Sequence, residues 1–246
     1  MSIYRLSLRL FFGIFIAGGL YVLFASIDYP WNWRVPWEYR SLFMQGFYFT
    51  LVASVGSIAL GFCLGVVGGL GRVSNSIMAR ELAALYVEIF RGTPLLVQIY
   101  VFYFCLATVV RYDNAMVIGI VTLACFSGAY ISEMVRAGIE SVDKGQVEAA
   151  KSTGLDYWQT MRYIIFPQAL KRIIPPVTGQ FVSLIKDSSL LSVISVRELT
   201  KASEIINATT YKTFEAYLPL AGLYLMLTYP LSYLTRRLEK GMKYEH

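Results

Sequence analysis

The chain has 246 residues, of which 56% are hydrophobic and only 15% are charged. A soluble domain carries about 25% charged residues, so this composition excludes an ordinary soluble globular protein. The net charge of +6 does not indicate a nucleic-acid-binding protein, because the basic residues cluster where a membrane protein would face the cytoplasm. The composition predicts an all-α integral membrane protein.

Two basic residues, Arg5 and Arg9, lie at the start of the first apolar segment, residues 8–27. Such a start is typical of a secretory signal peptide, but no clear A-x-A cleavage pattern follows it before Asp28. We therefore expect a retained anchor helix, with cleavage as the alternative. The aromatic stretch YPWNWRVPW, residues 29–37, comes next and suits the outer membrane interface.

Six apolar segments are long enough, or nearly so, to cross a bilayer, which takes about 20 residues. They are residues 8–27, 45–71, 78–110, 114–136, 173–196 and 215–236. With the N-terminus in the cytoplasm, the inner segments carry fourteen Lys and Arg residues and the outer segments six. This inside excess predicts that both termini are cytoplasmic.

Small residues recur every four positions in the second segment, at Gly61, Gly65 and Gly69. Such a spacing lets two helices approach closely in lipid. The partner helix belongs either to this chain or to a second subunit, and both alternatives stay open. At the cytoplasmic end of the fourth segment, Glu133 and Arg136 are three residues apart and can form a structural ion pair.

The largest polar segment, residues 137–172, lies on the predicted cytoplasmic side. Residues 144–151 are good helix formers, and Gly154 permits a left-handed end to that helix. Asp156, with a glutamine three residues later, has the spacing of a capping box that starts a second helix. At Pro167 we expect a break or kink. The pattern predicts a helix–turn–helix on the cytoplasmic surface, and an interfacial helix resting on lipid is the alternative.

This polar segment resembles the signature loop of permease subunits of bacterial ABC importers. That loop reads E-A-A, three residues, G, nine residues, I, one residue, then L-P. This chain matches it at Glu148, Ala149, Ala150, Gly154, Ile164 and Pro167, with Phe166 where leucine is usual. The resemblance implies that these residues, together with Leu155, form the coupling helix that docks on an ATPase subunit.

Further stretches are similar to the polar amino-acid uptake subfamily, of the histidine and glutamine permease type. They are IFRGTPLLVQIYVFYF (residues 89–104), SGAYISEMVRAGI (127–139) and IKDSSLLSVISVRELT (185–200). The resemblance implies an ABC importer permease fold of five core transmembrane helices in residues 41–243, with the coupling loop at 137–172. Residues 1–40 would add an N-terminal anchor helix and an external aromatic segment.

The chain lacks the G-x-x-x-x-G-K-[ST] motif that cradles phosphates, so we expect no ATPase site of its own. The only histidine is His246, and neither a metal site nor a catalytic residue is expected. The resemblance implies that ATP and Mg are bound by a dimer of partner ATPase subunits. It also implies a second permease subunit (identical or different), an extracytoplasmic amino-acid-binding protein, and contact with lipid but not with nucleic acid.

The expected function is therefore ATP-driven transport of a polar amino acid across the inner membrane by a multi-pass subunit that is not an enzyme. The sequence does not identify the amino acid. The alternative is an ATP-independent secondary transporter or channel, a class in which internal inverted repeats are common. We find no such repeat in this sequence.

Charged residues within the predicted spans indicate where the cargo would pass. Between Arg80 and Arg111, 30 residues would form one helix about 45 Å long, kinked at Pro94. Charges at membrane depth mark either a pathway or a paired site. We interpret five residues as lining or gating the passage, and salt bridges that only hold helices in register are the alternative. These residues are Glu88, Arg91, Lys186, Asp187 and Ser188, and Lys186 is the candidate for the cargo carboxylate.

Overall fold

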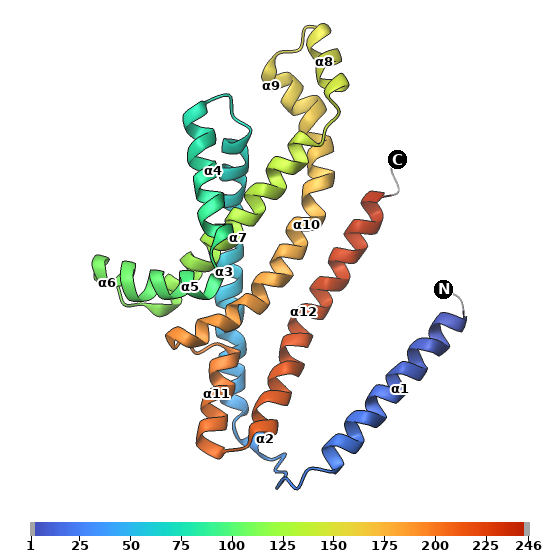
Figure 1. Ribbon diagram of the computed structural model, residues 1–246, viewed down its shortest axis with the longest axis vertical. Helices are drawn as coiled ribbons and strands as arrows, with labels where there is room; N and C mark the ends of the chain where they lie inside the picture. Colours follow the sequence, from blue (N-terminus) through green and yellow to red (C-terminus); the bar gives the residue numbers. More distant parts are fainter. Residues whose placement is uncertain (1–2, 244–246) are drawn as a thin grey trace. The chain divides into compact units, whose positions relative to one another are not determined.

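The computed structural model describes residues 3–243, and every regular element in that range is helical (Figure 1). The helices are α1 (Ile3–Ala25), α2 (Val35–Glu38), α3 (Arg40–Arg72), α4 (Ile77–Gly92), α5 (Leu95–Tyr100), α6 (Ala107–Val110), α7 (Ala115–Glu140), α8 (Lys144–Ser152), α9 (Tyr157–Thr160), α10 (Phe166–Asp187), α11 (Leu199–Thr210) and α12 (Thr213–Lys243). Two π-helical turns, η1 (Val101–Leu106) and η2 (Met161–Ile165), and the 3₁₀ segment η3 (Ser188–Ile194) join some of them. The chain divides between Arg34 and Val35 into two compact units.

The first unit contains α1 and the aromatic residues that follow it. Trp31 and Trp33 are stacked, with ring centroids 5.8 Å apart and planes 8° apart. Tyr29 meets Trp31 edge to face at 4.9 Å. The predicted N-terminal helix is present, and its aromatic segment packs its rings on one another.

The second unit is built around α3 and α7. Gly61, Gly65 and Gly69 are buried on the α3 face that meets α7. A Cβ atom added at Gly65 would lie 2.5 Å from the Cβ of Ile131, and one at Gly69 would lie 2.5 Å from the Cβ of Val135. The glycine face predicted from the sequence therefore packs against a helix of the same chain.

Two described helices, α3 and α7, are long and apolar enough to cross a membrane. A third span exists only if α4 and Leu95–Val110 are counted together, and these two parts meet at 106°. The single kinked helix predicted between Arg80 and Arg111 is therefore wrong. Pro94 disfavours a helical conformation at the preceding residue, and Thr93 is accordingly extended (φ −117°, ψ 145°), which separates α4 from α5.

The other two predicted spans of the second unit are helical for most of their length. Residues 173–196 are α-helical only as far as Asp187 and then continue as η3. Residues 215–236 lie within α12. The interior packs α3, α5, α7 and α10 around fully buried Ile99, Leu123 and Leu184.

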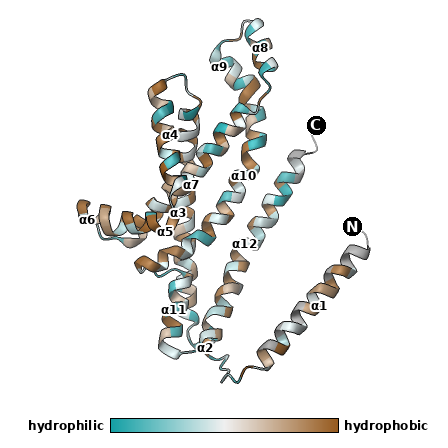
Figure 2. Cartoon of the chain, viewed as in Figure 1, coloured by the Kyte–Doolittle hydropathy of each residue, from teal (hydrophilic) through white to brown (hydrophobic). Residues whose placement is uncertain are grey.

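The outer faces of the helices stay apolar. Leu82, Leu85 and Ile89 on α4 are all more than half exposed. Figure 2 shows hydrophobic colour along α5 and α6, whereas α8 is largely hydrophilic. Since such apolar faces are unfavourable in water, they fit contact with lipid or another subunit.

Candidate functional site

The predicted helix–turn–helix forms the tip beyond the ends of α7 and α10 (Figure 1). α8 ends in a Schellman arrangement, in which Gly154 N–H donates to the Lys151 carbonyl (3.0 Å) and Leu155 N–H donates to the Ala150 carbonyl (3.1 Å). Gly154 has φ +83°, which a β-branched residue adopts only with strain. The predicted left-handed stop at Gly154 is confirmed, and it sets the direction in which the chain leaves α8.

The second helix begins with the predicted capping box. Asp156 Oδ1 accepts from the N–H of Gln159 (2.8 Å), and Gln159 Oε1 accepts from the N–H of Asp156 (2.9 Å). Of the break or kink expected at Pro167, the break does not occur, because helical conformation continues from α9 through η2 into α10, and the kink stays a prediction. Pro167 lies in the first turn of α10, directly after a π-helical turn, where its missing N–H is tolerated.

Two contacts tie this tip to the helices below it. Gln168 on α10 donates from Nε2 to Oε1 of Gln146 on α8 (2.6 Å). Arg172, one turn further along α10, donates to the carbonyl of Ser141, between α7 and α8. The first contact joins α8 to the start of α10, and the second joins α10 to the segment between α7 and α8.

The signature residues of the loop divide into outward-facing and packed positions. Glu148 and Ala149 are exposed on α8, whereas Ala150 is buried. Leu155 and Ile164 are half-buried, and α8 packs against η2. Pro167 is exposed at the start of α10. Small and apolar residues therefore hold the two helices together, while Glu148 and Ala149 stay exposed on α8.

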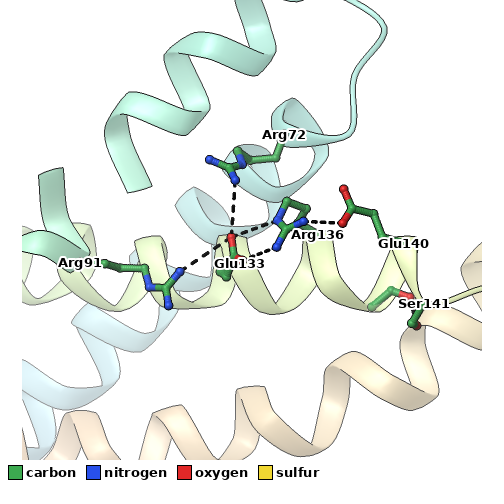
Figure 3. A network of polar contacts seen from close by, with 7 residues as sticks. Arg72, Arg91, Glu133, Arg136, Glu140 and Ser141 are labelled. Atoms are coloured by element: carbon green, nitrogen blue, oxygen red, sulfur yellow. Dashed lines mark hydrogen bonds and ion pairs between the residues drawn. The ribbon is translucent and has the colours of Figure 1, made fainter. Parts of the chain in front are cut away.

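A network of charges lies just before this loop (Figure 3). Glu133 on α7 accepts from Arg136 Nε (3.1 Å), and its Oε2 atom also lies 3.8 Å from nitrogens of both Arg72 and Arg91. Arg136 pairs in turn with Glu140. The Glu133–Arg136 pair predicted from spacing is confirmed. The two additional arginines were missed because they come from α3 and α4, and no local spacing brings them to α7.

One of the two predicted cargo-path residues on α4, Arg91, belongs to this network. Arg91 is bound to Glu133, and its guanidinium lies over the ring of Tyr130, 5.2 Å from the centroid. Glu88 is exposed on α4. One predicted path residue is therefore already engaged by a partner that sequence spacing did not reveal.

The remaining predicted path residues lie where α10 ends. Lys186 is exposed in the last turn, Asp187 is the final α-helical residue, and Ser188 is buried and donates to the Ile185 carbonyl (2.7 Å). Within residues 3–243, no ion pair or hydrogen bond joins this group to Glu88 or Arg91. The structure does not gather the five predicted residues into one contact cluster.

Glu198 is a buried acid that no local pattern in the sequence singles out. It caps α11 by accepting from the N–H groups of Thr200 and Lys201, and it accepts from the Tyr224 hydroxyl, each at 2.8 Å. Burial raises the pKa of Glu198, and these hydrogen bonds oppose the shift. Only folding brings Tyr224, 26 residues further along the chain, to this carboxylate.

The sequence matches known transport proteins over most of its length. Residues 57–244 match the family model described as "Binding-protein-dependent transport system inner membrane component". The chain is 43% identical over 214 residues to the probable glutamine ABC transporter permease protein GlnM of Bacillus subtilis (strain 168), covering 85% of this chain and 99% of that protein. It is 38% identical over 215 residues to the glutamine transport system permease protein GlnP of Escherichia coli (strain K12), covering 86% and 98%.

Solved structures show the same fold. A crystal structure of an amino acid ABC transporter with histidines has a TM-score of 0.81 and 35% sequence identity, covering 86% of this chain and 99% of that one. An inward-facing structure of the MetNI methionine ABC transporter has a TM-score of 0.69 at 20% identity, over 82% of this chain and 97% of that one, and shows the likeness of fold alone. The chain belongs to the family of inner membrane components of binding-protein-dependent transport systems.

Proposed function

We propose that this chain is the membrane-spanning subunit of an ATP-driven importer that carries a polar amino acid across the inner membrane. Glutamine is the first cargo to test, because the similar proteins of Bacillus subtilis and Escherichia coli carry that name. The alternative is ATP-independent transport, and uptake assays with and without the ATPase subunit separate the two.

The observation that carries the proposal is the geometry of α8 and α9. The turn at Gly154 and the capping box at Asp156 give the tip a defined shape, and the Gln146–Gln168 contact attaches it to α10. A rigid tip transmits displacement between subunits, whereas a flexible loop would absorb it. We propose that Glu148 and its neighbours dock on a dimer of ATPase subunits that bind ATP and Mg.

We propose the rest of the assembly by analogy with other ABC importers. It comprises a second permease subunit, identical or different, and an extracytoplasmic amino-acid-binding protein. The fold would have five core transmembrane helices plus α1, with both termini in the cytoplasm. The fourteen-to-six excess of basic residues in the inner segments supports this orientation.

Substitution of Gly154 tests the docking role. Gly154→Val should preserve membrane insertion but weaken ATPase binding and uptake, because valine resists a φ of +83°. Gly154→Asn is the matched control, since asparagine visits this conformation more readily. Normal uptake by a normally assembled Gly154→Val complex would contradict the docking role. Glu148→Lys, which reverses an exposed charge on α8, should also weaken docking.

We also propose that Glu88, Arg91, Lys186, Asp187 and Ser188 line or gate the cargo path. An amino acid carries an ammonium and a carboxylate, so a path with both charge signs suits it. Lys186→Met should impair uptake while ATP hydrolysis stimulated by the binding protein partly survives. Normal uptake by Lys186→Met would contradict a pathway role for Lys186. Simple failure of the variant chain to accumulate would contradict it as well.

A further inference from the structure

The turn between η3 and α11 carries an exposed arginine, Arg197, between two anchored neighbours. The turn starts at Ser195, whose φ of +63° is a left-handed conformation that a serine adopts only where the surrounding structure imposes it. Val196, before Arg197, is 4% exposed, and Glu198, after it, is fully buried. The fold therefore fixes the backbone on both sides of Arg197 and leaves its side chain at the surface.

Arg197 lines two neighbouring hollows in that surface. The first lies along the start of α3, where Ser41 and Gln45 also line it. The second lies at the start of α7, where Asn114 and Ser195 also line it. Both hollows are open to the outside rather than enclosed. The guanidinium group thus shares its surroundings with hydroxyl and amide groups, which can complete the hydrogen bonds of a polar partner.

The positive charge of Arg197 has no counter-charge at this place. In the described part of the chain, Arg197 is the only charged residue that lines either hollow, and its side chain forms no ion pair or hydrogen bond. The acid next to it, Glu198, is engaged by the Tyr224 hydroxyl and the start of α11. The loop before α7 adds one exposed base and one exposed acid, Arg111 and Asp113, whose charges cancel. An unpaired guanidinium is suited to a carboxylate, which it binds through two parallel hydrogen bonds.

The open shape of the hollows decides which carboxylate fits. Sites for small molecules enclose most of the ligand surface, and these hollows do not. A side chain that protrudes from a docking protein needs no such enclosure, because the rest of that protein covers it.

The position of the turn indicates which protein would dock there. Arg197 lies just before α11, and α2 and α11 lie at the opposite end of the second unit from α8 and α9 (Figure 1). If α8 and α9 dock on the ATPase in the cytoplasm, this end faces outside. We propose that Arg197 pairs with an Asp or Glu side chain of the extracytoplasmic amino-acid-binding protein, an inference that rests on the proposed function.

The test uses the complete transporter in lipid nanodiscs and its purified binding protein loaded with L-glutamine. ATP hydrolysis is measured as a function of the binding-protein concentration. Arg197→Glu should raise the binding-protein concentration that gives half-maximal stimulation about tenfold or more. Arg197→Lys keeps the charge but not the two parallel bonds, and should raise it about threefold at most. Hydrolysis without binding protein should stay unchanged in both variants.

Arg111→Glu is the matched control, because it reverses the charge of an exposed arginine that lines neither hollow. It should change the half-maximal concentration less than about twofold. Equal rises in Arg197→Glu and Arg111→Glu would overturn the inference, since long-range charge alone would explain both. No rise in Arg197→Glu would overturn it as well. If Arg197→Glu fails to accumulate, Arg197→Gln takes its place, with an expected rise of about threefold, and no rise would again contradict the pairing.

Two further outcomes separate this inference from its alternatives. If Arg197→Glu lowers L-glutamine uptake at saturating binding protein while the half-maximal concentration stays the same, Arg197 contacts the cargo and the inference is overturned. Absence of both stimulated hydrolysis and ATP-driven L-glutamine uptake in the unaltered transporter would instead overturn the proposed function, and this inference with it.

Discussion

The α3–α7 pair and the α8–α9 tip are both ordered, but by different means. In the pair, Gly65 and Gly69 let two long helices touch along their length, so the order comes from packing between distant segments. In the tip, Gly154 and Asp156 fix the chain through hydrogen bonds between near neighbours. One residue type therefore serves two different purposes, because glycine provides space in the pair and a positive φ in the tip.

The largest loss of stability is expected where packing between helices is disturbed. Gly65→Ala places a Cβ 2.5 Å from the Cβ of Ile131, so the helices must separate, at a cost of about 1–3 kcal/mol. Gly222→Ala is the matched control, since a Cβ at Gly222 in α12 meets nothing within 4 Å and alanine favours helix by about 1 kcal/mol. Unfolding in detergent measures both. Equal stability of the two variants would show that the α3–α7 contact is not tight.

The next effect is expected at the junction between the two regions, in the network around Glu133. Glu133→Gln keeps the shape but removes the charge shared by three arginines, and should lower the free energy of unfolding by about 1–2 kcal/mol, since partly exposed ion pairs contribute up to about 1 kcal/mol each. Glu140→Gln is the control, because Glu140 is more exposed and its ion pair among the described residues is with Arg136. The free energy of unfolding of Glu140→Gln should fall by less than about 1 kcal/mol. Equal losses would mean that the network adds nothing beyond surface pairs.

A smaller and local effect is expected in the tip. Asp156→Ala removes the cap from α9 and should cost about 1 kcal/mol, while Asp156→Asn keeps an accepting oxygen and should cost less. Hydrogen exchange should quicken in residues 157–165 and stay unchanged in α3 and α7. Faster exchange throughout the unit would contradict the local character of the tip.

The smallest effect is expected from the exposed amide contact between α8 and α10. Gln146→Ala removes the acceptor for Gln168 and should cost about 0.5–1 kcal/mol, too little to alter accumulation. If the contact helps the tip move with α10, the amount of amino acid transported per ATP hydrolysed should fall in the Gln146→Ala variant. Lys144→Ala, at another exposed position on α8, should leave this ratio unchanged. An unchanged ratio in Gln146→Ala would show that packing alone joins α8 to α10.

The sequence by itself determined the features that depend on near neighbours. Apolar segments indicated membrane helices, and the spacing of Asp156 and Gln159 specified a capping box. Gly154 was recognisable as a helix stop because a left-handed residue is an intrinsic backbone preference. The motif around Glu148 indicated the family for the same reason, since its spacing follows the local helix–turn–helix geometry.

Only the tertiary structure decided the features that join distant segments. It placed the glycine face of α3 against α7, brought Arg72 and Arg91 to Glu133, and brought the Tyr224 hydroxyl to Glu198. It also turned a predicted kinked span into two segments at 106°, since a proline allows a range of bends and the surrounding contacts select one. Contacts between segments far apart in the chain depend on how the helices pack, and no local pattern of residue types encodes that arrangement.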